Sequence, residues 1–253
     1  MTLMQFHIQS EVLQMGMDVW ALMPDQRKNE DEPLKVLWLL HGGSGDQTAW
    51  VRDTRIEAYA SQYGNLAVIL PNAYHSCFVD MAMGAKFGQY IGEELPQIMR
   101  SLLPALSVKR EDNFISGFSN GGYGCLYIGL RYPETFGAIG AYGAGDKADA
   151  DFSNRMLDKK RMFGEGEIKE SPYCVRRSAR LLAESGRPVP VVDHGCGEFD
   201  PWRAMNELVR DTFQAIPDDP YQYRFTLVEG DGHTGTCSGR LVEQFLERMM
   251  KKD

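Results

Sequence analysis

The sequence has few of the features that mark secreted, zinc-binding or membrane proteins. Its five cysteines are an odd number, lie far apart and form no C-x-x-C pair. This spacing is typical of neither a disulfide framework nor a structural zinc site, so we expect reduced thiols in the cytoplasm. No apolar run approaches the length that spans a membrane. The N-terminus lacks a basic segment and its apolar stretch is broken by polar residues, which argues against a signal peptide.

Positive charge is also scarce. The 253 residues hold 27 Lys and Arg against 35 Asp and Glu, which gives a net charge of −8. Basic residues gather only in two short segments, DKKR and the terminal MMKKD. A surface that binds nucleic acid needs clustered Lys and Arg, so we expect neither a nucleic acid nor a membrane as partner. A homo-oligomer is compatible with the sequence, although nothing in it indicates one.

The chain has no internal repeat or low-complexity linker and instead alternates between predicted strands and helices. The predicted strands cover residues 4–13, 17–24, 34–40, 65–71, 112–117, 136–144, 189–196 and 221–230. The predicted helices cover residues 54–64, 88–104, 121–133, 173–186, 201–216 and 239–252, with Pro96 tolerable only near a kink or a helix start.

This alternation predicts an α/β fold with a mostly parallel central sheet and helices on both faces. The first two strands read as an antiparallel hairpin at the sheet edge. Because no linker interrupts the pattern, we expect one domain over residues 1–253. The polar, irregular segment 146–172 indicates an insertion or a lid.

The glycine-rich stretch FISGFSNGGYG, residues 114–124, has three candidate structures. Asn120-Gly121 would suit a hairpin turn, but the residues after it have helical spacing. One phosphate-loop motif needs lysine where Tyr123 stands, and the other needs glycine where Tyr127 stands. The hairpin and both nucleotide motifs are therefore excluded.

The third structure is the G-x-S-x-G elbow, Gly117 to Gly121, which holds a serine nucleophile between a strand and a helix. The predicted strand and helix are both present. The turn is so tight that side chains two positions from the serine would collide, and only glycine has no Cβ. Ser119 is therefore the candidate nucleophile.

A serine nucleophile needs a histidine base that is held by a carboxylate, in the chain order Ser, acid, His. His233 lies in a glycine-rich loop after the last predicted strand, whereas His194 ends a strand, where packing is expected. The acid should follow that strand. Asp193 lies too close to the sheet, so Asp200 is favoured and Glu198 is second; position alone does not decide between them.

The oxyanion of acyl transfer needs two backbone N–H donors. Asn120, directly after the serine, supplies one, and Gly43 in the turn LLHGGSG is the candidate for the other. The mechanism requires no metal and no cofactor, and we expect neither. Residues on nearby loops are candidates for the substrate pocket: His41, Trp50, Tyr74, Phe78 and Trp202.

Six segments occur in the order seen in a known family: LLHGGSGDQTAW, VILPNAY, EELPQIM, ISGFSNGGYGCLYIGLRYPETFGAIGAYGA, CGEFD and GDGHT. With them the chain resembles the putative-esterase branch of the α/β-hydrolase superfamily, which includes tributyrin esterases, S-formylglutathione hydrolase (esterase D), feruloyl and acetylxylan esterases, and mycolyltransferases. The resemblance runs over nearly the whole chain and implies a single-domain α/β-hydrolase fold.

The resemblance also implies roles: Ser119 as nucleophile, Asp200 as acid, His233 as base, and Gly43 with Asn120 as oxyanion donors. The chain departs from the family in two places. Asn120 stands where the family commonly has Met, which makes that wall of the pocket more polar. The aromatic residues that often flank the family's histidine are missing around GDGHT.

The sequence therefore predicts a serine carboxylesterase that hydrolyses short acyl esters, acetyl esters above all, through an acyl-enzyme. The substrate is a small-molecule or carbohydrate ester. The alternatives are a thioesterase of the S-formylglutathione hydrolase type, a feruloyl esterase, and a non-catalytic binding protein with the same fold.

Overall fold

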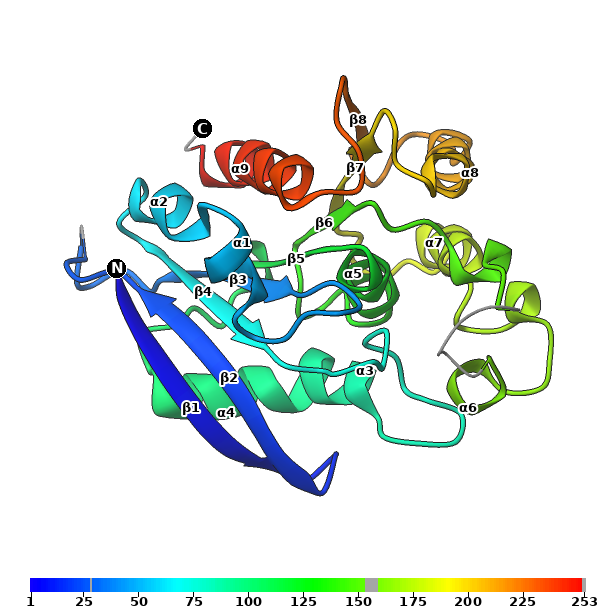
Figure 1. Cartoon of the computed structure of the whole chain (residues 1–253). Coiled ribbons are helices and arrows are strands. Elements are labelled where there is room, and N and C mark those ends of the chain that lie inside the picture. Colours follow the sequence, from blue (N-terminus) through cyan, green and yellow to red (C-terminus); the bar gives the residue numbers. More distant parts are fainter. Residues whose placement is uncertain (28, 153–158, 252–253) are drawn as a thin grey trace.

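The computed structural model describes residues 1–27, 29–152 and 159–251, and an eight-stranded sheet runs through the centre of this part of the chain (Figure 1). Its order is β1-β2-β4-β3-β5-β6-β7-β8. The pairs β1–β2 and β2–β4 are antiparallel, and all other pairs are parallel. The strands are β1 (Thr2–Ser10), β2 (Met15–Met23), β3 (Lys35–Leu40), β4 (Leu66–Pro71), β5 (Asn113–Phe118), β6 (Ala138–Tyr142), β7 (Val191–Gly197) and β8 (Arg224–Val228). The predicted parallel sheet with an antiparallel N-terminal edge is confirmed.

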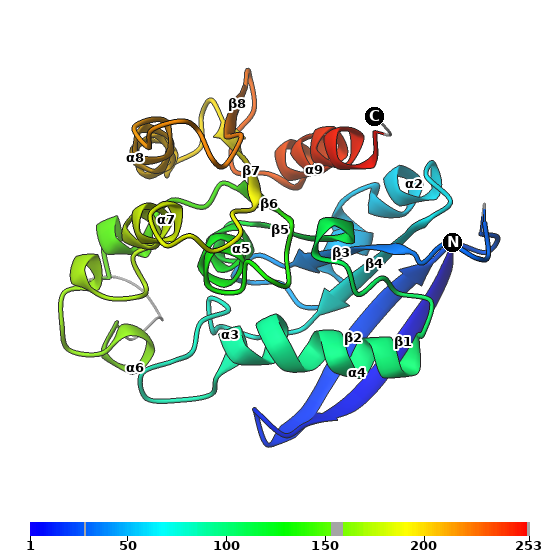
Figure 2. The same ribbon diagram turned by 180° about the vertical axis from the view of Figure 1, so that it is seen from behind.

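Helices cover both faces of the sheet, as Figures 1 and 2 show from opposite sides. The helices are α1 (Ala49–Asp53), α2 (Ile56–Ser61), α3 (Phe87–Gln89), α4 (Leu95–Leu102), α5 (Asn120–Arg131), α6 (Lys159–Phe163), α7 (Val175–Ala183), α8 (Arg203–Gln214) and α9 (Gly235–Met250). Shorter turns are the π-helical η1 (Tyr90–Glu94) and the 3-10 turns η2 (Arg110–Asp112), η3 (Lys147–Asp149) and η4 (Ile168–Glu170). Helices α1, α2 and α9 pack on one face, and α4, α5, α7 and α8 pack on the other.

The central strands are buried on both sides, which explains their near-continuous apolar sequences. Every residue of β4 is buried, and in β3 all but Lys35 are buried. Side chains of β3 alternate between the two cores: Trp38 packs with the helices on one face, and Leu37 packs with Phe245 of α9 on the other. A strand covered by helices on both faces has no solvent side, so the polar alternation of an exposed sheet is absent.

Several predicted boundaries were wrong. The predicted helix over 54–64 is only the short α2 (Ile56–Ser61), α1 (Ala49–Asp53) precedes it and was not predicted, and the last helix begins at Gly235 rather than at residue 239. Pro96 is the second residue of α4, which continues directly from the π-helical turn η1, so it lies within one helical run and next to an irregular turn rather than at a free helix start. The carbonyl oxygen of Gly92, four residues earlier, accepts the hydroxyl of Thr135 at 3.3 Å. Within 146–172 the structure places η3, α6 and η4, while residues 153–158 lie outside the described residues; the lid stays a prediction.

Three polar residues of interest follow parallel strands at the same edge of the sheet. Ser119 follows β5, Asp200 follows β7 by a short turn, and His233 follows β8. Because parallel strands end on the same side of a sheet, the fold brings loops that are over 100 residues apart in sequence into one region.

Candidate active site

Ser119 lies on the sharp turn between β5 and α5. Its φ of 58° and ψ of −120° fall in a region that residues other than glycine rarely adopt. A Cβ on Gly117 would lie 2.7 Å from the carbonyl carbon of Gly121, and a Cβ on Gly121 would lie 2.4 Å from the carbonyl oxygens of Leu40 and His41. A strained serine between two glycines that tolerate no side chain is the geometry of a nucleophile elbow.

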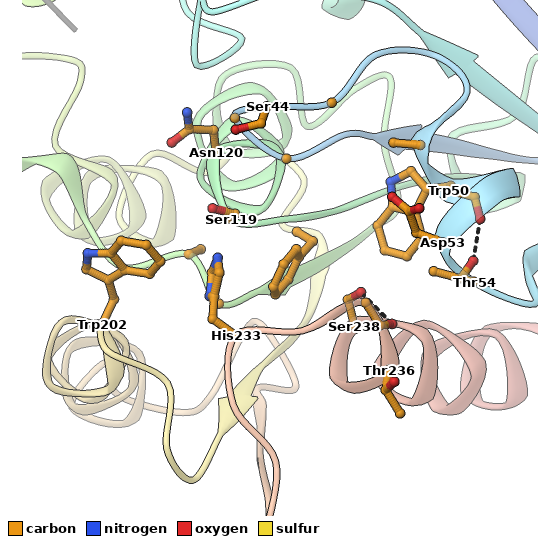
Figure 3. A pocket seen from close by; sticks show the side chains of 18 of the residues that line it. Ser44, Trp50, Asp53, Thr54, Ser119, Asn120, Trp202, His233, Thr236 and Ser238 are labelled. Carbon is orange, nitrogen blue, oxygen red and sulfur yellow. Dashed lines mark hydrogen bonds between the residues drawn. The ribbon is translucent and has the colours of Figure 1, made fainter. Parts of the chain in front are cut away.

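A hydrogen-bonded carboxylate and imidazole lie beside this serine. Nδ1 of His233 is 2.7 Å from Oδ2 of Asp200, whose side chain is fully buried. The other carboxylate oxygen, Oδ1, accepts the backbone N–H of Trp202 at 2.8 Å. With both oxygens occupied, the carboxylate holds the Nδ1 proton of the imidazole and leaves the Nε2 lone pair available as a base. Ser119 and His233 line the same cavity (Figure 3).

The competing acids and the competing histidine have other partners. Oε2 of Glu198 accepts the backbone N–H of Gly230 at 2.9 Å, which turns it toward the β8 loop. Asp193 is paired with Arg248 of α9. His194 is buried within β7, as its position in a strand predicts. Among the acids that the sequence left open, only Asp200 contacts His233 in the structure.

Two aromatic rings hold the imidazole of His233. The ring of Phe118 packs on it with centroids 4.2 Å apart, and the edge of Trp202 meets it at 4.5 Å. These contacts limit rotation of the ring, so the hydrogen bond to Asp200 and the aromatic contacts together set its orientation. Phe118 was missed by the sequence analysis, although it is the residue inside the elbow that directly precedes the serine.

The turn after β3 provides a candidate oxyanion site, and hydrogen bonds of the buried His41 hold its backbone in place. Nδ1 of His41 donates to the carbonyl oxygen of Gly42 at 2.7 Å, and Nε2 accepts the backbone N–H of Ala73 at 3.1 Å. Burial lowers the pKa of His41, which favours the neutral ring that this pattern requires. Since C=O and N–H point in opposite directions across a peptide plane, the bond to Gly42 sets the direction of the Gly43 N–H.

The cavity around Ser119 has a volume of about 690 Å³. In Figure 3, Trp202 lies on one side of Ser119 and His233, and Trp50 lies on the other with Asp53. The lining on the Trp50 side is rich in polar groups. Further polar lining residues are Ser44, Thr54, Thr236 and Ser238. The cavity is therefore large enough for a small ester, with hydroxyl and carboxylate groups along one wall.

Three predicted pocket residues lie elsewhere, which corrects the expectation from sequence. His41 is buried beneath the Gly42 turn, and Phe78 is buried with its ring 5.0 Å from that of His41. Tyr74 is 49% exposed and is not part of the cavity lining. Trp50 and Trp202 do line the cavity. Lys147, which the sequence analysis did not single out, lines it as well.

Among the residues that the structure describes, no group of three or more His, Cys, Asp or Glu side chains is arranged to hold a metal ion. Across the same residues, no helix combines the length and the apolar composition that a membrane crossing requires.

Comparison with known proteins adds independent information. A family model described as "Putative esterase" matches residues 10–171. The curated acetyl esterase of Caldicellulosiruptor saccharolyticus is 36% identical over 269 residues, with 99% of each chain covered. Two solved Staphylococcus aureus structures cover 99% of both chains: the fluorophosphonate-binding serine hydrolase FphF (TM-score 0.88, 28% identity) and the S-formylglutathione hydrolase FrmB (TM-score 0.87, 27% identity). The chain therefore belongs to the putative esterase family and is a carboxylic ester hydrolase.

Proposed function

We propose that this protein is a serine carboxylesterase that hydrolyses short acyl esters, acetyl esters above all, through an acyl-enzyme. The hydrogen bond between His233 and Asp200, on the same cavity as the strained Ser119, is the observation that carries the proposal. The 36% identity to an acetyl esterase supports the preference for acetyl.

In the proposed mechanism, Nε2 of His233 takes the proton of Ser119 as Oγ attacks the ester carbonyl carbon. The carbonyl oxygen gains a negative charge, which the N–H groups of Gly43 and Asn120 stabilise. His233 then returns the proton to the leaving alcohol, and the C–O bond breaks. Water, activated by the same imidazole, attacks the acyl-enzyme and releases the acid. Asp200 orients the imidazole and stabilises its charged form in both steps.

We infer a hydroxyl-rich alcohol group, such as a carbohydrate, from the polar wall of the cavity. Asp53 and the hydroxyl oxygens of Thr54 and Ser238 offer acceptors there, and Thr236 adds a hydroxyl group. Sugars bind through such groups. Two alternative substrates also have support. The similarity to FrmB, named an S-formylglutathione hydrolase, favours a thioester, and the fold is shared with a ferulic acid esterase (TM-score 0.80, 17% identity).

We also propose a cytoplasmic location. All five cysteines lie within the described residues, they are buried, and no disulfide joins them. Buried thiols in place of disulfides are expected in a reducing compartment.

Substitution of the nucleophile tests the reaction itself. Ser119→Ala should reduce kcat on p-nitrophenyl acetate by about 10⁵-fold or more and abolish labelling by a fluorophosphonate, because both depend on the same oxygen. Ser116→Ala, in β5 three residues before Ser119, is the control for the serine reagent. Retained hydrolysis and labelling in Ser119→Ala would disprove the proposed mechanism.

The substrate class needs a panel of esters. Rates on acetylated sugars, tributyrin, methyl ferulate and S-formylglutathione, compared as kcat/KM, rank the alternatives. Acetylated sugars should rank first if the polar wall binds the alcohol. A higher rate on S-formylglutathione than on every oxygen ester would replace the esterase proposal with a thioesterase.

A further inference from the structure

Lys147 is a buried lysine at the wall of the cavity. It is 5% exposed and belongs to the cavity lining. Its Nζ donates a hydrogen bond of 2.8 Å to Oδ1 of Asn120 and lies 5.4 Å above the ring of Tyr123. Burying an ammonium group costs free energy unless its charge is compensated, so lysine is seldom buried without a specific reason. The hydrogen bond to Asn120, the residue after the proposed nucleophile, indicates that Lys147 is buried for a role at the candidate active site.

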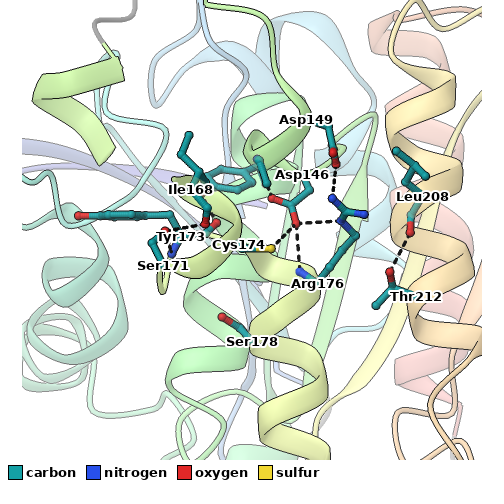
Figure 4. Close-up of polar contacts among 12 residues, drawn as sticks. Asp146, Asp149, Ile168, Ser171, Tyr173, Cys174, Arg176, Ser178, Leu208 and Thr212 are labelled. Atoms are coloured by element: carbon teal, nitrogen blue, oxygen red, sulfur yellow. Dashed lines mark hydrogen bonds and ion pairs between the residues drawn. The ribbon is translucent and has the colours of Figure 1, made fainter. Parts of the chain in front are cut away.

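The backbone around Lys147 is anchored on both sides, as Figure 4 shows for the flanking residues. The fully buried carboxylate of Asp146 accepts the backbone N–H of Ala148 at 3.0 Å and both Nε and the backbone N–H of Arg176, at 3.3 and 3.1 Å. Nη2 of the same arginine is 2.6 Å from Asp149. The short turn η3 is thus fixed to the start of α7. These contacts hold the backbone from which the side chain of Lys147 extends to the cavity wall.

Asn120 connects this lysine to the oxyanion turn. The ammonium group can only donate, so the amide oxygen of Asn120 must face Lys147 and its nitrogen must face away. That nitrogen lies against Gly43: a Cβ at position 43 would be 2.6 Å from Nδ2. One side chain therefore spans from Lys147 to Gly43, and the two residues proposed as N–H donors pack directly on each other.

We propose that Lys147 is a positioning residue that holds the amide of Asn120 against Gly43 and so keeps the two oxyanion donors at a fixed separation. This inference rests on the proposed function, because it assigns a role within that reaction. Lys147 acts through Asn120 and needs no contact with the substrate.

The physical argument concerns the transition state rather than substrate binding. A neutral ester carbonyl gains little from two N–H donors held at the right separation, whereas the oxyanion gains much more. Loss of Lys147 should therefore lower kcat more than it raises KM. A lysine with only a structural role would instead lower the stability of the fold without a preferential effect on kcat.

The first test is Lys147→Met, which keeps an apolar stem of similar length and removes the charge. We expect kcat on p-nitrophenyl acetate to fall by about ten- to a hundredfold, with KM changed by less than about threefold. Lys147→Arg should restore part of kcat, because its guanidinium keeps N–H donors for the amide oxygen of Asn120. The control is Lys86→Met: Lys86 is an exposed lysine that donates to the carbonyl oxygen of Met81. It should retain full kcat.

A double-mutant cycle with Asn120→Leu tests the connection. Asn120→Leu keeps its backbone N–H but cannot bind Lys147, so kcat should fall by about tenfold or more, and Lys147→Met should have little further effect in that background. Independent, multiplicative effects would contradict the inference. If Lys147→Met fails to fold, Asn120→Leu decides alone: unchanged kcat in the folded variant overturns the inference.

Fluorophosphonate labelling of Ser119 separates this inference from the proposed function. If wild-type protein is labelled and hydrolyses esters but Lys147→Met has unchanged kcat, only the role of Lys147 is wrong. If wild-type protein is neither labelled nor active, the proposed function fails. A fall in thermal stability of Lys147→Met, with no change in kcat at a temperature where it is folded, shows a purely structural lysine and also overturns the inference.

Discussion

His194 lies in β7, and His233 lies in the loop after the adjacent strand β8. The two imidazoles differ in the chemical groups that contact their ring nitrogens. His194 is 1% exposed, and both of its ring nitrogens have neutral partners. Nδ1 is 2.7 Å from the hydroxyl of Tyr223, and Nε2 is 2.9 Å from Oδ1 of Asn206. Burial lowers the pKa of His194 to about 4, so the ring is neutral at neutral pH.

The loop histidine, His233, has a carboxylate on one nitrogen and an open cavity on its other side. Aromatic packing does not distinguish the two: Phe225 lies 5.2 Å from His194, and Phe118 lies 4.2 Å from His233. The difference lies in the partners. A carboxylate stabilises the charged imidazolium that a base becomes, whereas neutral partners in a buried site do not. The comparison shows what converts a packing histidine into a candidate base.

The largest effect should come from removing the base. His233→Gln should lower kcat on p-nitrophenyl acetate by about 10⁵-fold, since without an imidazole Ser119 loses its proton acceptor. The matched control is His75→Gln, at an exposed histidine outside the cavity lining, which should change kcat by less than about threefold. A loss of activity in the control as large as in His233→Gln would remove the distinction between the two sites.

A smaller loss should follow removal of the carboxylate charge. Asp200→Asn should lower kcat by about 10⁴-fold, because the amide no longer stabilises the imidazolium and favours the wrong tautomer. Glu198→Gln should cost less than about tenfold, since Glu198 binds the backbone of Gly230 rather than the imidazole. If Glu198→Gln were the more damaging change, the assignment of Asp200 as the acid would be wrong.

The smallest effect concerns stability and belongs to His194. Its folded-state pKa of about 4 lies below the ordinary value of 6.5, so the unfolded chain binds the proton first as the pH falls. The free energy of unfolding should therefore drop by about 3 kcal/mol between pH 6.5 and 4, and stay level with respect to this group above pH 6.5.

Urea unfolding of wild type and His194→Gln at pH 7, 5.5 and 4.5 measures this contribution. The variant should show a weaker pH dependence, and the difference between the two curves isolates His194 from other titrating groups, including His41, whose pKa burial also lowers. His7→Gln, at an exposed histidine, should keep the wild-type slope. Equal slopes in wild type and His194→Gln would show that His194 is not held neutral by the fold.

Much of the architecture could be predicted because it depends on local patterns. Apolar runs separated by helical segments leave few arrangements other than a parallel sheet. The short strand-to-helix turn of residues 117–121 is equally local, so the backbone geometry at Ser119 could be predicted from its glycines. The boundaries were harder to predict, since the short helix α1, the length of α2 and the start of α9 depend on packing against the sheet.

The contacts of the candidate acids and the composition of the pocket required the three-dimensional structure. Asp200 and Glu198 are two residues apart, and only the direction of each side chain separates them. Phe118 and Lys147 have no distinctive sequence signal, because their importance comes from contacts with residues distant in sequence or across the turn. Tyr74 and Phe78 were predicted as pocket residues because they are aromatic and lie near a motif. Neither property determines whether a side chain points into the cavity.

The contact of the elbow with the turn after β3 has a consequence for how this protein's specificity can diverge. Gly121 abuts the carbonyl oxygens of Leu40 and His41, so the elbow of the proposed nucleophile and the candidate oxyanion turn meet through main-chain atoms. Substitutions there would disturb both at once and would be removed by selection. Changes of substrate range should therefore accumulate in the side chains that surround this contact, such as Asn120 and Trp202, while the main chain beneath them stays constant.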